Sequence, residues 1–281
     1  MRLATIRNED ESTSAVRVEG HTGYRLDYSN VSDLLRHPDW EVRAREESAS
    51  RVDIAQADFA PVLPQPGKIV CVGLNYARHI TEMGRDLPEF PTLFAKYPES
   101  LIGARDVIVI PPESSSVDWE AELALVMGST VRRATADQAA QAIAGFTILN
   151  DVTMRDWQYR TPMWLQGKTF EDSSPLGPLL VTPDELDGGT KPDLVISSHV
   201  DGEMVQEART SDLVFSPTDL VSYVSTILTL HPGDVIATGT PEGVGHARKP
   251  PIYLRPGSVL TTRIEGIGEL VNTCIAERIT Q

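Results

Sequence analysis

A chain of 281 residues, 41% hydrophobic and 23% charged, has an ordinary globular composition and is long enough for one large domain with a smaller one appended. Its 25 basic and 40 acidic residues give a formal net charge of −15, which opposes binding to nucleic acid or to an anionic membrane surface. The chain shows no apolar run of the roughly 20 residues that span a bilayer and no secretory signal, and Cys71 and Cys274 stand far apart among apolar neighbours. We therefore expect a cytoplasmic protein with reduced cysteines.

The first 65 residues are predicted to form a small α+β subdomain. Short apolar stretches alternate with polar turns, and a helix-like stretch, SDLLRH, follows them. Pro61, Pro64 and Pro66 then form a stiff, extended connector. This pattern places a boundary near residue 65 and leaves residues 66–281 as the main domain.

The main domain is predicted to be rich in strands. Many short apolar runs are separated by Gly and Pro and only two helices are clear, which favours a β-dominated α+β fold over a doubly wound sheet. Thr135 and Gln138 form a capping-box pattern at the start of the first helix, and Gly145 is placed to end it. In the second helix Ser216 is the expected N-cap and Pro217 lies in the first turn. The apolar face of this second helix is expected to contain Leu220, Val221, Val224, Ile227 and Leu228.

Two carboxylates stand one residue apart in the stretch VDWEAELALVMG. If this stretch is one strand, Glu120 and Glu122 share a face that becomes apolar further along, at Ala124 and Val126. The glutamates are then expected at the rim of a buried region, where an unpaired carboxylate is costly unless a cation or hydrogen bonds compensate it. Asp151 stands at the tip of another predicted strand, because it ends an apolar run in GFTILNDVTMRDWQ.

Glu120, Glu122 and Asp151 together would offer hard oxygen ligands of the kind that Mg²⁺, Mn²⁺ or Ca²⁺ select, with coordination positions left open for substrate oxygens. The alternative is a solvated acidic strand end. On spacing alone that alternative is the more common case.

Four stretches resemble successive motifs of the fumarylacetoacetate hydrolase family, in the same order and at similar spacings. They are DWEAELALVMG, GFTILNDVTMRDWQ, QGKTFEDSSPLGP and LHPGDVIATGTPEGVG, and the resemblance runs from about residue 67 to the C-terminus. It implies a mixed β-roll catalytic domain, usually a homodimer, with a divalent metal held by three carboxylates. Glu120, Glu122 and Asp151 match those ligands, with Mg²⁺ or Mn²⁺ as the expected ion and Ca²⁺ as a further option.

The resemblance also implies a lid helix. In LNYARHITEMG, His79 and Glu82 fit an H-x-x-E pattern that supplies a base to order or activate water in family members that cleave carbon–carbon bonds. Three residues apart on a helix, the two side chains share a face. A surface histidine is the alternative for this motif taken alone.

Four further residues match the family's active site. Lys168 resembles a lysine that donates a charged hydrogen bond near the metal and the substrate carbonyl, and Gln158 resembles a glutamine that assists at the carbonyl oxygen. Thr240 resembles the hydroxyl that contacts a substrate carboxylate, and Gly239 beside it allows close backbone approach. Each of them alone would be an ordinary salt bridge, surface amide or turn.

A metal at such a site would polarise the carbonyl of a small anionic 2-oxo acid and stabilise its enolate. Because both His79 and Glu82 are present, we expect first the hydrolysis of an acylpyruvate such as fumarylpyruvate to pyruvate and a carboxylic acid, downstream of aromatic ring cleavage. Decarboxylation of an oxaloacetate-type acid and isomerisation of 2-hydroxyhepta-2,4-diene-1,7-dioate are enzymatic alternatives. A catalytically silent metal-binding protein of the same fold is the alternative from another class.

Basic residues gather around the motifs of this acidic chain. We expect some of them, Arg78 and Arg85 above all, to bind a dianionic substrate, with ordinary surface arginines as the alternative. The set is Arg78, Arg85, Lys96, Arg155, Arg160 and Lys168.

Overall fold

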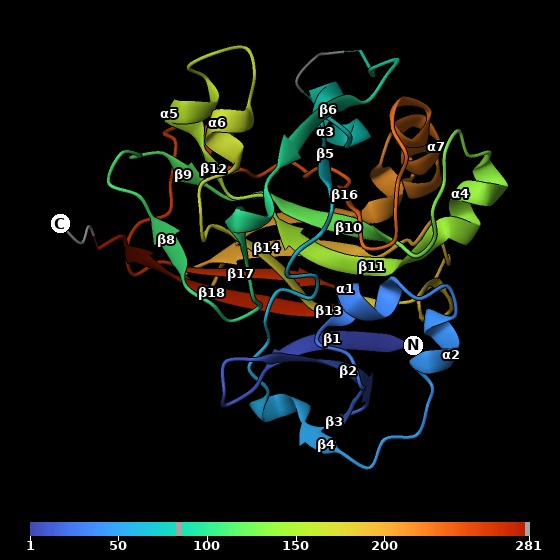
Figure 1. Cartoon of the computed structure of the whole chain (residues 1–281). Coiled ribbons are helices and arrows are strands. Elements are labelled where there is room, and N and C mark those ends of the chain that lie inside the picture. Colours follow the sequence, from blue (N-terminus) through green and yellow to red (C-terminus); the bar gives the residue numbers. More distant parts are fainter. Residues whose placement is uncertain (83–85, 279–281) are drawn as a thin grey trace.

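The computed structural model describes residues 1–82 and 86–278, apart from the side chains of His79 and Glu82. Strands dominate these residues, and most of the strands belong to two sheets (Figure 1). The predicted β-dominated α+β class with a mixed sheet is confirmed.

The larger sheet contains eleven strands among the described residues. In spatial order its main path is β4 (Arg51–Asp53), β3 (Thr22–Arg25), β2 (Thr13–Glu19), β1 (Arg2–Arg7), β13 (Ser174–Val181), β11 (Ile143–Asn150), β10 (Ala121–Met127), β16 (Val235–Ala237), β5 (Ile69–Gly73) and β6 (Thr92–Lys96). Strand β7 (Leu101–Ile102) pairs in parallel with β13 off this path. Strands β10 and β11 form an antiparallel pair in which every residue is buried, as expected of strands covered on both faces.

A second sheet packs against the centre of the first. Its order is β15 (Glu203–Arg209), β14 (Val195–Val200), β17 (Val259–Ile264), β18 (Gly268–Ala276) and β8 (Ile108–Ile110). Leu123 of β10 and Ile148 of β11 share a hydrophobic cluster with Ile196, Ile264 and Leu270 of the second sheet. A separate two-stranded pair joins β9 (Val117–Asp118) to β12 (Thr153–Met154).

The alternation predicted for VDWEAELALVMG is present in β10. Leu123 and Leu125 enter the cluster between the sheets, whereas Ala124 and Val126 enter a second cluster on the other face. The prediction of a single strand is wrong, because β9 ends at Asp118 and β10 begins at Ala121. The break comes where the chain leaves its pairing with β12 and takes up its pairing with β11.

The helices are short. They are α1 (Val31–Leu35), α2 (Trp40–Arg43), α3 (Ala77–Glu82), α4 (Ala136–Ala142), α5 (Arg155–Gln158), α6 (Leu165–Lys168) and α7 (Pro217–Ile227). Single 3₁₀ turns are η1 (Ile54–Gln56), η2 (Pro98–Ser100), η3 (Pro183–Glu185), η4 (Thr210–Asp212) and η5 (Gly245–Ala247).

The predicted starts of α4 and α7 are confirmed, and two predicted details of these helices are wrong. Thr135 with Gln138, and Ser216 with its N3 residue, form complete capping boxes. Gly145 does not end α4 but lies within β11, where an added Cβ would come 2.4 Å from the carbonyl oxygen of Val181. The glycine is therefore explained by the close approach of β13 and not by a helix end. Ile227, predicted in the apolar face of α7, is 57% exposed at the last residue of that helix.

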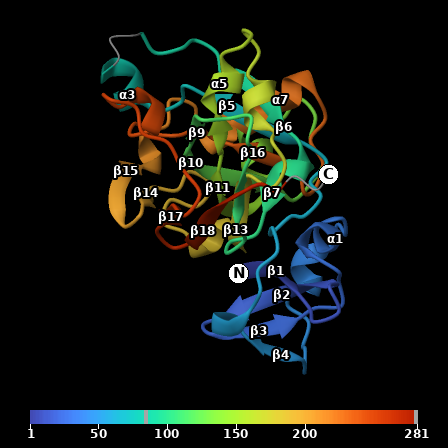
Figure 2. The same cartoon turned by 90° about the vertical axis from the view of Figure 1, so that its left-hand side faces the viewer.

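The N-terminal strands extend the large sheet. Strand β1 pairs with β13 in a register that includes Leu3 opposite Leu180. Strands β1–β4 lie at one end of the molecule, at the bottom of both ribbon views, with α1 and α2 beside them (Figures 1 and 2). The boundary near residue 65 between a small subdomain and a catalytic domain stays a prediction.

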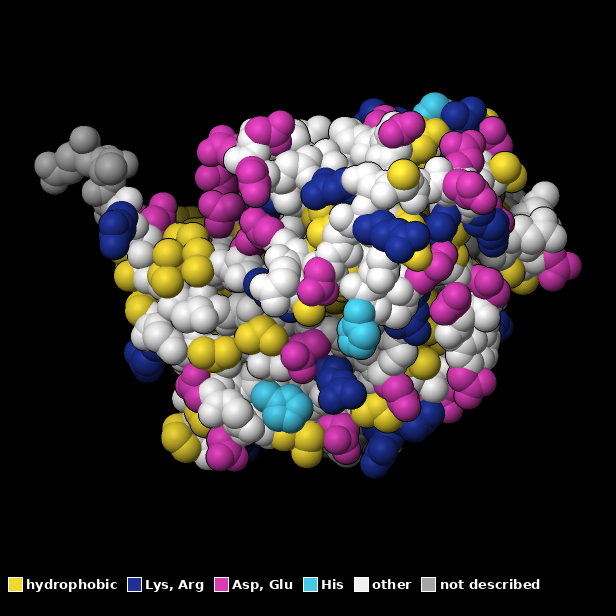
Figure 3. Space-filling view, turned by 90° about the horizontal axis from the view of Figure 1, so that it is seen from below, with side chains coloured by type: hydrophobic (Ala, Val, Ile, Leu, Met, Phe, Trp, Pro, Cys, Tyr) yellow, Lys and Arg dark blue, Asp and Glu magenta, His cyan; other side chains and the backbone are white. Residues whose placement is uncertain are grey.

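The surface seen from below carries acidic and basic side chains side by side, without one large patch of a single sign (Figure 3). Cys71 and Cys274 are free and buried, as predicted. Among the described residues, no helix has both the length and the apolar character that crossing a bilayer requires.

Candidate active site

The pairing of β10 with β11 brings three carboxylates together. Because the strands are antiparallel, the start of β10 meets the end of β11, with Ala121 opposite Asn150. One step beyond that pair, the Asp151 N–H donates to the carbonyl oxygen of Glu120 at 2.8 Å. Glu120, Glu122 and Asp151 each place a carboxylate oxygen within 4.8 Å of the others.

All three carboxylates are buried. Glu120 is 7% exposed, Glu122 is 1% exposed and Asp151 is 0% exposed. The alternative of a solvated acidic strand end is therefore wrong. The expectation that the glutamates lie where the strand enters the core is confirmed.

Asn150 holds this strand end in place. Its Oδ1 accepts the Glu120 N–H at 3.0 Å, and its Nδ2 donates to Oγ1 of Thr262 on β17 at 2.8 Å. One buried amide thus fixes the backbone of a candidate ligand against the second sheet. Nothing in the sequence distinguished this asparagine from a turn residue.

Two lysines neutralise part of the acidic cluster. Lys168, at the end of α6, places Nζ 2.7 Å from Glu120 Oε2 and 2.7 Å from Asp151 Oδ2. Lys96, at the end of β6, places Nζ 2.8 Å from Asp151 Oδ1 and also donates to the carbonyl oxygen of Lys168. The structure therefore brings Lys168 to the candidate metal site, and Lys96 is engaged with Asp151 instead of being free to bind a substrate.

Arg155 connects the candidate ligands to Gln158. Its Nε lies 2.8 Å from Asp118 Oδ2 and its Nη1 lies 2.7 Å from Glu120 Oε1. The same Nη1 donates to Oε1 of Gln158 at 2.9 Å. This contact occupies the amide oxygen of Gln158 and leaves its NH₂ group as the donor available to a ligand.

Asp118 is the residue that joins α5 to the glycine-rich turn. Its Oδ1 accepts the Gly245 N–H at 2.7 Å, and its Oδ2 accepts the His246 N–H at 2.9 Å in addition to Nε of Arg155. Asp118 is fully buried and close in sequence to the ligand pair, but the sequence argument gave it no role.

Glu122 differs from Glu120 and Asp151 because it makes no ion pair with a described residue. Among the ion pairs of the described residues none includes Glu122, whose Oε2 accepts only the Gly239 N–H, at 2.8 Å. Burial, and then the charges of Asp151 and Glu120, raise the pKa of Glu122 well above its ordinary value. The ionised form of this side chain therefore needs an additional positive charge nearby.

The pKa values of Asp151 and Lys168 shift in the directions that favour the charged form of each side chain. Burial alone would raise the pKa of Asp151, but Lys168 and Lys96 outweigh it and lower that pKa. Burial would lower the pKa of Lys168, but Asp151 and Glu120 outweigh it and raise that pKa, so the ammonium group stays protonated.

A divalent cation fits this donor set. The cluster contains four buried carboxylates and three buried cations, so its net charge is −1 when all seven groups are ionised. The carboxylates are Asp118, Glu120, Glu122 and Asp151, and the cations are Lys96, Arg155 and Lys168. A divalent ion would reverse the sign of the cluster and compensate Glu122. Oxygen donors of this kind suit Mg²⁺, Mn²⁺ and Ca²⁺ alike, so the residues do not select the ion.

A cavity of about 350 Å³ opens over these groups. Glu120, Glu122, Lys168 and Gln158 line it with buried polar side chains, whereas Tyr159 lines it while 59% exposed. The remaining lining comes from the end of β5, from β6, from the segment between α5 and α6 and from residues 240–247. In both ribbon views β5 and α5 lie at the end of the molecule opposite the N-terminal strands (Figures 1 and 2).

The glycine-rich turn contributes Thr240 to this lining. Thr240 Oγ1 accepts a hydrogen bond from Nε2 of Gln206 at 2.9 Å, which leaves its own proton free to donate. Gly239 has a φ of +100°, and a Cβ added there would lie 2.9 Å from the carbonyl oxygen of Val72. Only glycine combines this backbone with such a close approach.

Of the other predicted site residues, the structure describes Arg78 fully, the backbone of His79 and Glu82, and no part of Arg85. The helix predicted around His79 and Glu82 is present as α3, but both side chains lie outside the described residues, as does Arg85 altogether. Arg78 is exposed, its backbone N–H donates to Asp212 at 3.0 Å, and it is not among the described residues that line the cavity.

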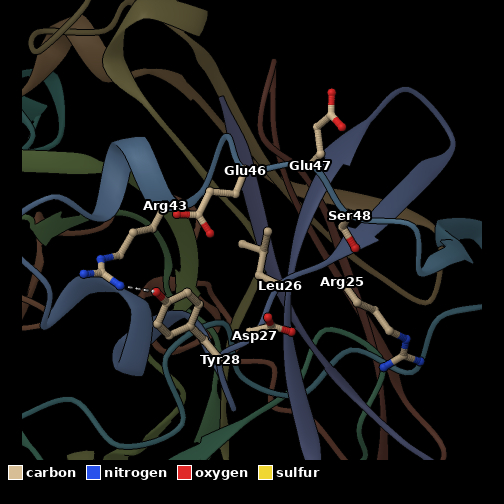
Figure 4. A pocket seen from close by; sticks show the side chains of 8 residues that line it. All are labelled: Arg25, Leu26, Asp27, Tyr28, Arg43, Glu46, Glu47 and Ser48. Atoms are coloured by element: carbon tan, nitrogen blue, oxygen red, sulfur yellow. Dashed lines mark hydrogen bonds between the residues drawn. The ribbon is translucent and has the colours of Figure 1, made fainter.

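A second hollow lies among the N-terminal elements (Figure 4). Its volume is about 50 Å³, which holds one or two water molecules at ~30 Å³ each. Two of its lining residues are hydrogen-bonded, because Arg43 donates to the Tyr28 hydroxyl at 3.0 Å. This hollow is too small for a 2-oxo acid, and none of the candidate site residues lines it.

A buried carboxylate triad that could hold a divalent metal therefore lies beneath an open cavity at the end of a mixed sheet. The family model described as fumarylacetoacetate (FAA) hydrolase C-terminal matches residues 68–275, and the chain belongs to this enzyme family. The predicted family membership is confirmed.

Relatives in this family carry different names. The chain is 43% identical over 222 residues, 79% of its own length and 70% of the relative's, to a rat protein named oxaloacetate tautomerase Fahd2a, mitochondrial. It resembles a solved fumarylacetoacetate hydrolase from Exiguobacterium antarcticum with a TM-score of 0.86 and 31% identity, covering 99% of this chain and 100% of that one. It also resembles a solved 5-carboxymethyl-2-hydroxymuconate delta-isomerase from Mycobacterium smegmatis with a TM-score of 0.82, 32% identity and the same coverage. Because the rat relative is named mitochondrial, the predicted cytoplasmic location stays a prediction.

Proposed function

We propose that this protein is a divalent-metal-dependent enzyme that interconverts the keto and enol forms of an oxaloacetate-type 2-oxo diacid. The observation that carries the proposal is Glu122, a buried carboxylate that pairs with no cation of the described residues and lies beside Glu120 and Asp151 in a cavity with protonated donors. The 43% identity to a rat protein named oxaloacetate tautomerase supports the choice of substrate class.

Glu120, Glu122 and Asp151 would hold the metal. When bound, such an ion supplies Lewis-acid polarisation of a 2-oxo carbonyl and stabilises the negative charge of an enolate. Lys168 and the NH₂ group of Gln158 line the same cavity and would donate hydrogen bonds to the oxygen that becomes negative. The Thr240 hydroxyl, whose oxygen already accepts from Gln206, would donate to the substrate carboxylate.

Keto–enol interconversion also needs a group that moves the C3 proton. His79 and Glu82 on α3 are the proposed pair for this step, because the resemblance assigns a base to that motif and both lie on the short helix that follows β5. Tautomerisation requires proton transfer and oxyanion stabilisation, and Lys168 and Gln158 are the proposed donors for the second of these.

Hydrolysis of an acylpyruvate such as fumarylpyruvate, the first expectation from the sequence, is the second candidate. It requires the same oxyanion donors and in addition an ordered water at the second carbonyl. The neighbour named fumarylacetoacetate hydrolase, with a TM-score of 0.86, favours keeping it. Decarboxylation of oxaloacetate and isomerisation of a 2-hydroxydienedioate draw on the same enolate chemistry.

One panel separates these activities. The protein is incubated with Mg²⁺, with Mn²⁺, with Ca²⁺ or with EDTA, and each mixture receives enol oxaloacetate, fumarylpyruvate or 2-hydroxyhepta-2,4-diene-1,7-dioate. Loss of the enol absorbance with oxaloacetate retained in the mass spectrum supports tautomerisation, whereas pyruvate as a product indicates decarboxylation or hydrolysis. The Lys168→Met variant controls for catalysis by free metal. Turnover that EDTA does not abolish would contradict the proposed metal dependence, and no turnover of any substrate would favour a silent metal-binding protein.

The homodimer implied by the resemblance is a separate proposal. Sedimentation equilibrium of the intact chain tests it, with a single species at twice the chain mass of 30.8 kDa as the expected result. A monomer at all concentrations would contradict it.

A further inference from the structure

His246 is a lining residue of the candidate cavity that no step above uses. It lies in η5 and shares the lining with Glu120, Arg155 and Lys168. Its backbone N–H and Arg155 Nε both donate to Oδ2 of Asp118, at 2.9 Å and 2.8 Å. A single buried carboxylate oxygen therefore ties the backbone of His246 to the polar end of the cavity.

The imidazole ring of His246 is held on more than one side. Nδ1 lies 2.9 Å from the Tyr253 hydroxyl, and the ring centroid lies 5.2 Å from that of Tyr159 and 6.3 Å from that of Tyr253. When the Tyr253 hydroxyl donates to Nδ1, the ring proton lies on Nε2, which then becomes a donor. A ring fixed in this way loses little further freedom when it binds a ligand.

The other cations near the cavity are engaged elsewhere. Lys168 and Arg155 lie in ion pairs with buried carboxylates. The Arg160 guanidinium stacks 3.4 Å from the centre of the Trp157 ring, and Arg248 donates to backbone carbonyl oxygens. Among the described residues that line the cavity, His246 is the only group that can carry a positive charge and is not in an ion pair.

A diacid of the oxaloacetate type presents two unlike ends. The carboxylate beside the 2-oxo group belongs with the metal ligands and Thr240, at the buried polar end of the cavity. A second carboxylate that extends towards the exposed end would meet the apolar lining side chains of Leu74, Val244 and Ala247. An unpaired carboxylate against apolar side chains is unfavourable unless a donor meets it.

We infer that His246, oriented by Tyr253 and Tyr159, binds the distal carboxylate of the substrate and so selects diacids over monoacids. This inference rests on the proposed function, because it specifies the substrate of that same site. His246 would then make the selection that the sequence predicts for Arg78 and Arg85.

The test measures binding separately from turnover. The ligands are 3,3-difluorooxaloacetate, a diacid that lacks C3 hydrogens and cannot enolise, and oxalate, which offers only the chelating end. Calorimetry on the Mg²⁺-loaded protein compares the unchanged chain with His246→Phe, which keeps a ring but has no donor, and with Tyr253→Phe, which removes only the hydroxyl. We expect His246→Phe to weaken the difluoro diacid about 10- to 100-fold, as for loss of a hydrogen bond to a charged group, and to leave oxalate within about twofold.

A matched control is His37→Phe. His37 also lies beside a tyrosine, with its ring centroid 5.2 Å from that of Tyr28, but it belongs to the N-terminal segment. It should change neither affinity. The Tyr253→Phe variant should weaken the diacid less than His246→Phe, because the donor remains and only its orientation is lost. Equal losses for diacid and oxalate, or no loss for the diacid, would overturn the inference.

Turnover distinguishes this inference from the proposed function. In the unchanged chain and in His246→Phe, kcat/KM is compared for oxaloacetate and its 4-ethyl ester, which lacks the distal charge. The preference for the diacid should fall at least about tenfold in the variant, the counterpart of the binding loss. If the unchanged chain turns over neither compound, the proposed function fails, and the two binding affinities still decide the role of His246.

Discussion

Lys96 and Asp151 form an ion pair in which both side chains are 0% exposed, with Nζ 2.8 Å from Oδ1. A pair buried this deeply is costly to form and more costly to break, because removal of Lys96 leaves Asp151 with Lys168 as its remaining described ion partner, in a cluster that already carries a net negative charge. Lys96→Met keeps the aliphatic stem and removes the ammonium group. We expect it to lower the free energy of unfolding of the metal-free protein by about 3–5 kcal/mol in chemical denaturation.

The matched control for Lys96 is Lys68. Lys68 Nζ lies 2.7 Å from a carboxylate oxygen of Asp234, whose side chain is 1% exposed, but the lysine itself is 32% exposed. Water can replace the ammonium group at such a site, so Lys68→Met should cost clearly less than Lys96→Met. An equal cost for both variants would mean that the burial of the Lys96 pair contributes nothing.

Glu122 and Asp151 should respond oppositely to neutralisation in the absence of metal. Asp151→Asn breaks contacts to Lys96 and Lys168, whereas Glu122→Gln replaces a buried carboxylate that makes no ion pair with a described residue. We expect Asp151→Asn to destabilise the metal-free protein and Glu122→Gln to leave it as stable or make it more stable. Thermal unfolding in EDTA measures both.

Asp151→Asn and Glu122→Gln should both weaken metal binding. Because each substitution removes a candidate ligand oxygen, we expect the calorimetric affinity for Mg²⁺ or Mn²⁺ to fall by more than the ~10- to 100-fold typical of losing a supporting contact. Undiminished affinity in Glu122→Gln would contradict the assignment of Glu122 as a ligand.

The raised pKa of Glu122 has a consequence for pH dependence. Because burial favours the protonated form, the folded metal-free protein binds this proton more tightly than the unfolded chain, whose pKa is near 4.5. Stability from this group is therefore complete below the ordinary glutamate range and is lost as the pH rises towards the folded pKa. Asp151 has the opposite sign, because its lowered pKa gives stability that is lost as the pH falls.

Bound metal should remove the pH dependence of stability that comes from Glu122. We expect Mg²⁺ affinity to rise with pH across the range in which Glu122 loses its proton, and metal to raise the unfolding temperature most at the upper end. Unfolding temperatures measured from acid to neutral pH, with Mg²⁺ and with EDTA, check this. The Glu122→Gln variant is the control and should lack the downward slope in EDTA.

Spacing alone favoured a solvated acidic strand end, and the resemblance to the family's motifs selected the three candidate ligands, whose proximity then follows from local strand order. Glu120 and Glu122 precede an apolar strand, Asp151 follows another, and an antiparallel pair brings the start of one strand to the end of the next. Strand alternation placed Ala124 and Val126 on the correct face, although Trp119 and Glu120 interrupt the strand.

The supporting residues could not be predicted because their partners are distant in sequence. Lys96 meets Asp151 across 55 positions, and Asp118 meets the Gly245 N–H across 127. A sequence shows Lys96 only as one of several basic residues near the motifs. The prediction that Gly145 ends a helix was wrong for a related reason. A glycine at a helix end and a glycine required by the close approach of a neighbouring strand cannot be told apart until the strand register is known.

The Asp118 carboxylate accepts four hydrogen bonds, one from the adjacent Trp119 N–H and three from Arg155, Gly245 and His246. The positions of the last three residues therefore depend on one side chain. Asp118→Asn would set an NH₂ group against one of these donors, so α5 and the turn that carries Thr240 would lose their common anchor. We expect kcat/KM for the substrate that the panel identifies to fall about 10- to 100-fold, mostly through KM, while metal affinity changes less. Asp234→Asn is the matched control, because Asp234 is also a buried carboxylate that accepts from a lysine and a backbone N–H, of Lys68 and His231, but does not line the cavity. If Asp234→Asn raised KM as much as Asp118→Asn, the effect would reflect general destabilisation and not the positioning of Arg155 and the turn.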